Sequence, residues 1–307
     1  MKDTVAASEI SIAQGSQSFA AAAKLMSAGM RDDTVMLYAW CRHADDVIDG
    51  QDLGSRPDPG ADAEARLSQL RADTLEALHG DLPMSPPFEA LRAVARRHAF
   101  PDRWPLDLIE GFAMDVNARQ YRTLSDTLEY SYHVAGVVGV MMARVMGVRD
   151  PAVLDRACDL GLAFQLTNIA RDVMDDAAIG RCYLPQDWLN AADASIEGEI
   201  PSPAVYEVIL RLLDAAEPYY GSARAGLPGL PLRCAWSIAA AARIYHAIGT
   251  RIRRGGPKAY RTRIRTSGAA KVGMVLRSGG DAFLSRASGK NVSREGLWNR
   301  PRADEKA

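Results

Sequence analysis

The sequence contains few cysteines, and their positions exclude a cysteine-based metal site. Cys41, Cys158, Cys182 and Cys234 lie far apart, without the paired spacing that zinc sites require. Isolated cysteines are most simply explained as reduced thiols of a cytoplasmic protein. Residues 1–30 have no continuous apolar core, so we expect no signal peptide.

Long apolar runs and an excess of either charge are missing too. No stretch reaches the roughly 18 unbroken apolar residues of a membrane-spanning helix, because the closest candidate, Val134–Ala143, is followed by Arg144. We therefore expect a cytoplasmic protein that is soluble or at most peripheral at a membrane. The formal net charge of −1 argues against a general nucleic-acid-binding protein.

No segment keeps the alternation of apolar and polar residues that is typical of β-strands. Helical periodicity recurs instead, interrupted by segments rich in Gly, Pro and Asp such as residues 51–60 and 81–87. The expected helices span residues 34–50, 61–78, 88–98, 106–122, 128–147, 153–176, 201–220 and 229–254. In the most apolar of these, Gly136 and Gly139 predict close approach of another helix or of a substrate chain. The sequence therefore predicts an all-α fold with helices packed around a central cavity.

The composition gives no reason to divide the chain. Hydrophobic residues make up 48 % of the 307 residues, which is enough for a buried core. No Gly/Ser linker interrupts the sequence, and its two acidic segments lie more than a hundred residues apart. We expect one catalytic domain over residues 1–307, with a polar, loose C-terminal tail from about residue 285.

The segment QLTNIARDVMDDAAIGRCYLP, residues 165–185, carries the first candidate site. On a helix, Gln165, Asn168, Asp172 and Asp176 share one face, because residues three and four apart are neighbours. Carboxylate and amide oxygens are hard ligands that suit Mg²⁺. Arg171 beside them is unusual for a bare metal site but suits a metal-bound phosphate. For this segment alone, a solvated acidic helix end is the alternative.

A second segment, YAWCRHADDVID at residues 38–49, repeats this pattern. Tyr38, Arg42, Asp45 and Asp49 step by four, three and four residues and share one helical face. Two acidic helices that face each other repel unless cations lie between them. Two such helices, each with an arginine, are what a site for a diphosphate and several Mg²⁺ ions needs.

These two motifs resemble those of the squalene and phytoene synthase family. They are DDVID at residues 45–49 and NIARDVMDD at residues 168–176. Other phrases are similar to the bacterial phytoene synthase branch of that family. They are GSQSF at 15–19, EGFAMDV at 110–116, YHVAGVVG at 132–139, GRCYLP at 180–185, AEPYY at 216–220 and GLPLRCAW at 229–236. The resemblance covers roughly residues 10–275.

The resemblance implies an isoprenoid synthase fold and a Mg²⁺-dependent prenyltransferase of carotenoid biosynthesis, with Mn²⁺ as an alternative metal. The implied reaction joins two molecules of geranylgeranyl diphosphate head to head. It passes through a cyclopropyl (prephytoene) diphosphate, releases diphosphate and gives phytoene. No NADPH is expected, because this product requires no reductant. Water must be excluded, since it would convert the allylic cation to an alcohol.

The same resemblance assigns roles to individual residues. The metal ligands are Asp45, Asp49, Asn168, Asp172 and Asp176. The catalytic groups are Asp45, Asp49, Asp172, Arg171 and Tyr183. The residues expected to bind substrate are Ser16, Ser18, Tyr38, Arg42, Gln165, Arg171, Arg181, Tyr245, Arg263 and Lys271.

Several residue assignments stay open. Ser16 and Ser18 can equally cap a helix N-terminus. Asp115 and Arg119 are four residues apart, so they form either a surface ion pair or part of the site.

The basic stretch RIRRGGPKAYRTRIR, residues 251–265, is open as well. It suits solvent, nucleic acid or anionic lipid as well as a diphosphate. Within it, Arg261 or Arg265 could take the role assigned to Arg263.

Three other functions compete with this assignment. The nearest is squalene or dehydrosqualene synthesis from farnesyl diphosphate, because tunnel residues that set chain length cannot be identified from one sequence. A class I terpene cyclase and a non-catalytic scaffold homologue are the others. The implied partners are geranylgeranyl diphosphate, a membrane surface that receives the hydrocarbon, and neighbouring carotenoid enzymes.

Overall fold

The structure is a computed structural model of the chain, and it describes residues 8, 23, 25–48, 50, 62–262, 268–288 and 292–302. Five residues considered for the site lie outside these ranges: Ser16, Ser18, Asp49, Arg263 and Arg265. The ordered elements within the described residues are helices, and no strand occurs among them. The predicted all-α fold is confirmed.

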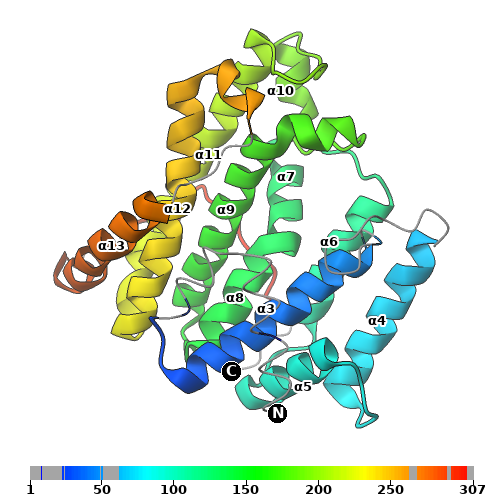
Figure 1. The fold of residues 1–307 in the computed structure, drawn as a ribbon, viewed down its shortest axis with the longest axis vertical. Coiled ribbons are helices and arrows are strands. Elements are labelled where there is room, and N and C mark those ends of the chain that lie inside the picture. Colours follow the sequence, from blue (N-terminus) through cyan, green and yellow to red (C-terminus); the bar gives the residue numbers. More distant parts are fainter. Residues whose placement is uncertain are drawn as a thin grey trace.

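Figure 1 shows the arrangement of these helices. In chain order they are α3 (Ala28–Ile48), α4 (Ala63–His79), α5 (Pro86–His98), α6 (Arg103–Val116), α7 (Leu124–Ser131), the π-helical turn η1 (Tyr132–Gly136), α8 (Val137–Val145), α9 (Pro151–Ala178), α10 (Gln186–Ala191), α11 (Pro203–Gly226), the 3₁₀ turn η2 (Leu227–Gly229), α12 (Leu232–Gly255), the 3₁₀ turn η3 (Pro257–Arg261) and α13 (Gly268–Ser288).

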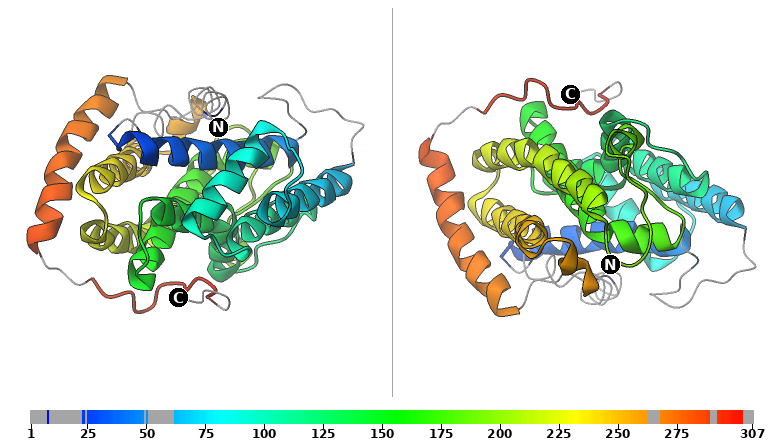
Figure 2. Two further views of the ribbon diagram at one scale, coloured as in Figure 1. Left: turned by 90° about the horizontal axis from the view of Figure 1, so that it is seen from below. Right: turned by 90° about the horizontal axis from the view of Figure 1, so that it is seen from above.

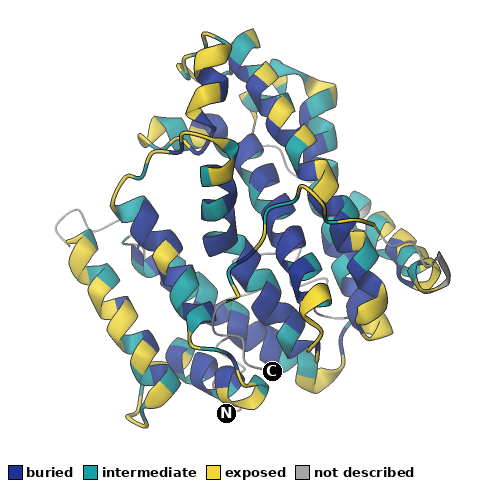
Figure 3. Cartoon of the chain, turned by 180° about the vertical axis from the view of Figure 1, so that it is seen from behind, coloured by how far each residue is buried: buried dark blue, intermediate teal, exposed yellow. Residues whose placement is uncertain are grey.

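Helix α9 is the central element (Figure 1). It packs against α8, η1, α11 and α12, and its residues are among the most deeply buried, as the dark core in Figure 3 shows. Its start follows from Asp150, whose side chain accepts a hydrogen bond from the Ala152 amide, with Pro151 at the first helical position. Its end precedes Gly180, which has a positive φ of 77°.

The outer helices cover the two sides of α9. Helix α3 packs on α8 and α5, and α4 lies outside α5 and α6. On the other side α12 contacts α9, and α13 lies at the outer edge of the molecule alongside α12 (Figure 2). Helices α3 and α9 therefore both pack on α8.

Two glycine contacts explain how closely α9 approaches α8 and the turn η1 that precedes it. A Cβ atom on Gly139 would lie 2.4 Å from the carbonyl oxygen of Ala157, and one on Gly161 would lie 2.3 Å from that of Ala135. The close helix approach that the glycines predicted is thus present. The single helix expected over residues 128–147 contains the π-helical turn η1 between α7 and α8.

The C-terminal strap, residues 292–302, was expected to be loose, and that expectation is wrong. Arg294 donates two hydrogen bonds of 2.7 and 2.8 Å to the buried carboxylate of Asp159. Arg300 is itself buried and donates a 2.9 Å bond to the buried Asp155. The strap is polar because its arginines neutralise carboxylates inside the fold. Residues 268–288, moreover, form a helix.

Candidate active site

A cavity of about 640 Å³ lies along α9. Its lining on this helix runs from Val153 to Asp176, a distance of roughly 35 Å at about 1.5 Å per residue. Near Val153 most lining side chains are apolar, among them Met146, Leu227 and Leu230, although Arg156 lines this end as well. The opposite end is polar. Such a long cavity with one polar end suits an extended apolar molecule with a charged head.

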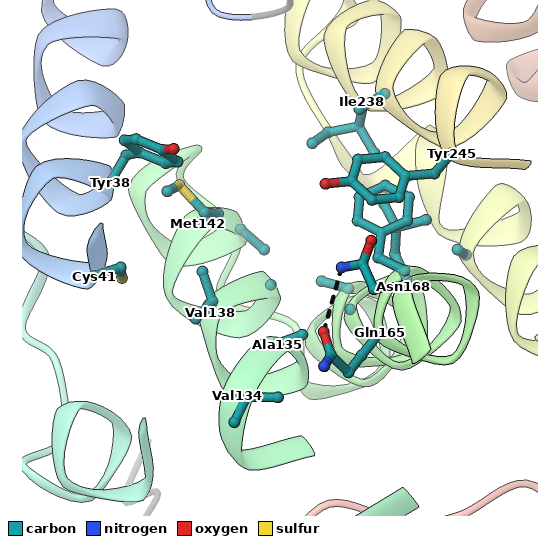
Figure 4. Close-up of a pocket in the computed structure, with 18 of the residues that line it drawn as sticks. Tyr38, Cys41, Val134, Ala135, Val138, Met142, Gln165, Asn168, Ile238 and Tyr245 are labelled. Carbon is teal, nitrogen blue, oxygen red and sulfur yellow. Dashed lines mark hydrogen bonds between the residues drawn. The ribbon is translucent and has the colours of Figure 1, made fainter. Parts of the chain in front are cut away.

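The two polar stripes predicted from the sequence line this one cavity. Helix α3 contributes Tyr38, Arg42 and Asp45. Helix α9 contributes Gln165, Asn168, Arg171, Asp172 and Asp176. In Figure 4, Tyr38 on α3 lies across the cavity from Tyr245 on α12, with Asn168 and Gln165 on the α9 side. Segments more than a hundred residues apart thus form one polar end.

Each stripe pairs its arginine with its own carboxylates. Arg42 donates to Asp45 at 3.0 Å and lies 2.6 Å from the buried Asp46. Arg171 donates through Nε to Asp172 at 2.8 Å and makes a second bond to the same carboxylate through Nη2. These pairs hold each guanidinium group next to a carboxylate. A ligand bound at this end of the cavity would therefore meet both positive and negative side chains.

The surroundings of Asn168 and Asp176 are compatible with a bound cation. The Oδ1 atom of Asn168 is buried and has no hydrogen-bond partner within the described residues, while its Nδ2 lies 3.4 Å from Gln165 Oε1. Burial, followed by the negative charge of Asp172, raises the pKa of Asp176 to about 7. Because a cation would satisfy both groups, the donor set fits a hard metal such as Mg²⁺. No three His, Cys, Asp or Glu side chains in the described part of the chain group around a metal position.

Asp115 turns toward the cavity, which resolves one open alternative. Arg119 pairs with Glu129, whereas Asp115 accepts hydrogen bonds from Tyr130 at 3.0 Å and from Tyr183 at 2.8 Å. All three of the hydrogen-bonded residues line the cavity. Asp115 therefore belongs to the site.

Two tyrosines form a stacked pair on Asp115. The rings of Tyr130 and Tyr183 lie 4.6 Å apart with an angle of 16° between their planes. Burial, followed by the charge of Asp115, raises the pKa of both hydroxyls, so both stay protonated. Tyr183 was predicted at the site, but Tyr130 was missed, because nothing in its spacing within residues 124–131 sets it apart.

Tyr245 marks the side of the cavity formed by α12. Its ring stacks on Phe164 with centroids 4.1 Å apart. Burial raises the pKa of its hydroxyl, and the neighbouring Arg171 opposes this shift. Tyr38 on the facing helix has its pKa raised to about 12 by burial. Both phenols are therefore neutral hydrogen-bonding groups at neutral pH.

Two expected substrate contacts, Arg181 and Lys271, lie outside the cavity lining, as does Arg261, the alternative to Arg263. Arg181 follows α9 and is close enough for its charge to lower the pKa of Asp176. Arg261 lies on η3 and is exposed. Lys271 lies on α13, which contacts α12 through Trp236 and Arg243.

The position of Lys271 conflicts with its predicted role. At 100° per residue, Trp236 and Arg243 lie on the face of α12 opposite Ile238, Ala241 and Tyr245, which line the cavity. Helix α12 therefore separates α13 from the cavity, and the structure does not bring Lys271 to the polar end.

The fold and the site together are those of an isoprenoid synthase. A crystal structure of a dehydrosqualene synthase in complex with ligand superposes with a TM-score of 0.80 at 27 % identity. The match covers 91 % of this chain and 96 % of that chain. A sequence profile described as squalene/phytoene synthase matches residues 12–270. The chain belongs to the squalene/phytoene synthase family.

Its relatives narrow the resemblance within the family. A 15-cis-phytoene synthase from a Paracoccus species is 73 % identical over 301 residues, covering 98 % of this chain and 99 % of the relative. A phytoene synthase from Pseudescherichia vulneris is 50 % identical over 295 residues, covering 94 % and 96 % respectively. Both matches extend over nearly the whole length of this chain, and so include α3 and α9.

Proposed function

We propose that this chain has 15-cis-phytoene synthase activity and joins two molecules of geranylgeranyl diphosphate head to head. The observation that carries the proposal is one long apolar cavity with the polar faces of α3 and α9 at the same end. The identity of 73 % to the Paracoccus 15-cis-phytoene synthase supports this reaction over squalene synthesis from the shorter farnesyl diphosphate.

The proposed metal is Mg²⁺, with Mn²⁺ as an alternative. Asp45, Asn168, Asp172 and Asp176 would hold several such ions between the two helices, together with Asp49, which lies outside the described residues. Bound ions would supply positive charge that neutralises the diphosphate leaving group. The unpartnered Asn168 Oδ1 and the raised pKa of Asp176 support this donor set.

The protein's own groups would bind and orient the substrates. Arg42 and Arg171 would bind diphosphate oxygens, with Arg181 beside them, because guanidinium groups stabilise the charge that develops on the leaving group. The tyrosine pair on Asp115 would close the cavity next to the reacting carbons. The apolar lining would keep water from the allylic cation.

The remaining assignments concern the whole chain. We propose a single catalytic domain, because α3, α9 and α12 all line the same cavity. No helix in the described ranges is long and apolar enough to cross a bilayer. We place the protein in the cytoplasm, peripheral at a membrane when its product leaves, with neighbouring carotenoid enzymes as candidate partners.

A product assay tests the activity directly. Purified protein with Mg²⁺ and no NADPH is given geranylgeranyl or farnesyl diphosphate in separate reactions, and the extracted hydrocarbons are identified by mass. We expect phytoene from the longer substrate. A squalene-type product from the shorter one alone would move the chain to that branch, and no product from either would favour a scaffold. An equal yield of product in the presence of EDTA would contradict the proposed requirement for a metal.

A further inference from the structure

Helix α13 carries large apolar side chains on its solvent side. Val272, Leu276 and Phe283 are 61, 67 and 69 % exposed, and Leu284 is 64 % exposed. At 100° per residue the first three fall within about 40° of one another around the helix. These four residues, named here the α13 apolar face, make up four of the nine large hydrophobic residues exposed within the described residues.

The α13 apolar face is not needed for packing within the described fold. Helix α13 packs mainly on α12 and η2 (Figure 2). Its inner side holds the helix in place, since Ser278 and Ala282 are fully buried and Trp236 of α12 donates a 2.6 Å hydrogen bond to the Val275 carbonyl. The helix is therefore anchored on one side while its apolar side chains point away.

The charges that flank this face are positive. At 100° per residue, Arg277 and Arg286 lie on either side of it, whereas Lys271 lies on the inner side of the helix with Ser278 and Ala282. The only acidic residue of this helix, Asp281, is bound by Arg243 of α12 through two hydrogen bonds. An amphipathic helix with exposed Leu, Val and Phe and basic flanks has the chemistry of a helix that lies on an anionic bilayer.

The C-terminal end of α13, which carries Phe283 and Leu284, also lies next to the apolar end of the cavity. Arg286 donates a hydrogen bond to the carbonyl of Leu230, a residue that lines that end. Leu232, at the start of α12, is 48 % exposed nearby in the sequence. A surface seated on α13 would thus be close to where an isoprenoid tail ends.

We propose that the α13 apolar face docks on the surface of a bilayer that contains anionic lipid. Val272, Leu276 and Phe283 enter the acyl boundary, and Arg277 contacts the headgroups. The apolar end of the cavity is then held beside the lipid phase. This inference rests on the proposed function for its purpose, because a long hydrocarbon is insoluble in water, but vesicle binding itself is independent of catalysis.

Vesicle sedimentation of the full-length protein tests the proposal. Vesicles of phosphatidylcholine alone are compared with vesicles that also contain phosphatidylglycerol. We expect the double variant L276E/F283E to bind the mixed vesicles at least about tenfold more weakly than the wild type. The matched control L75E/L82E changes two exposed leucines outside α13 and should bind as the wild type does. R277Q should lose about fivefold, and only with the anionic vesicles.

Two further readouts separate the outcomes. Product formation from substrate dispersed in detergent should be equal for the wild type and L276E/F283E, so loss of activity in both would refute the proposed function without touching the docking surface. Wild-type protein that stays in solution, or a double variant that sediments like the wild type, would overturn the docking proposal. Sedimentation velocity would overturn it in favour of a second copy of the chain, if the wild type is a dimer and the double variant a monomer.

Discussion

At the residue scale, the raised pKa of Asp176 makes the stability of the protein depend on pH. Burial and the charge of Asp172 raise its pKa in the folded protein to about 7, whereas an aspartate in an unfolded chain ionises near about 4. The folded state therefore holds the proton more tightly than the unfolded state. Its contribution to stability is present below pH of about 4 and is lost as the pH rises to about 7.

We expect Asp176→Asn to remove this dependence in protein freed of divalent cations. The stability gained over the wild type should grow between pH about 4 and 7, level off above, and reach on the order of 4 kcal/mol, because about three pKa units contribute about 1.4 kcal/mol each. Thermal unfolding in EDTA at several pH values measures it. Asp175→Asn is the matched control, because Asp175 is the exposed neighbour on the same helix. Parallel curves for the two variants would contradict the raised pKa.

Asp172 is the carboxylate whose loss should affect catalysis without affecting the fold. Asp172→Ala removes a proposed metal ligand and the partner of Arg171, so we expect turnover to fall by about a hundredfold or more. Helical circular dichroism should stay unchanged, since Asp172 makes no contact in the apolar core. Steady-state assays beside Asp175→Ala give the comparison, and retained activity would remove Asp172 from the site.

The stripes could be predicted from the sequence because helical periodicity alone decides which residues share a face. Contacts between side chains of different elements leave no periodic pattern in the sequence. Asp115 and Tyr130 come from different helices and Tyr183 from a loop, so their hydrogen bonds appear only once the chain is folded. Lys271 was misplaced for the same reason, because nothing in a sequence says that α12 stands between it and the cavity.

At the element scale, the two glycine contacts determine how closely α9 packs against η1 and α8, which line one wall of the cavity. We expect Gly161→Ala to destabilise the protein by about 2 to 3 kcal/mol, because the new methyl group would lie 2.3 Å from the Ala135 carbonyl oxygen. Gly221→Ala in α11 meets no atom within 4 Å and should add up to about 1 kcal/mol. Urea unfolding measures both, and equal effects would refute the close approach.

Helix α13 could not be predicted by the criteria that found the others. Those criteria look for an apolar stripe that faces a core, whereas the large side chains of α13 face outward. The helix also contains Gly273, Gly279 and Gly280, which lower intrinsic helix propensity. Its helical form comes from packing on α12. The short helix α10 was missed too, because one and a half turns leave little periodicity to detect.

At the scale of the whole molecule, the C-terminal strap joins the far end of the chain to the start of α9. Asp155 and Asp159 are 4 % and 0 % exposed and receive their charge partners from Arg294, Arg300 and Arg302. Trp298 packs on Tyr132 as well, with ring centroids 5.3 Å apart. A polar composition suggested a loose tail, but the partners of its arginines lie about 140 positions earlier.

Truncation after residue 288 should therefore destabilise the protein strongly. It leaves two buried carboxylates without cations, which costs about 3 to 5 kcal/mol for each. We expect a large drop in Tm, whereas truncation after residue 302 keeps every one of these ion pairs and should leave Tm unchanged. Differential scanning calorimetry compares the two. A normal Tm for the shorter chain would mean that Asp155 and Asp159 find other partners.

The strap also determines when folding can be completed during synthesis of the chain. Residues 292–302 leave the ribosome after every described helix has been made, yet α9 cannot bury its two carboxylates favourably until they arrive. A nascent chain that already contains α13 but lacks the strap would leave the start of α9 open to proteases, although every described helix has been translated. Synthesis of the strap, rather than formation of the helices, would then complete the fold.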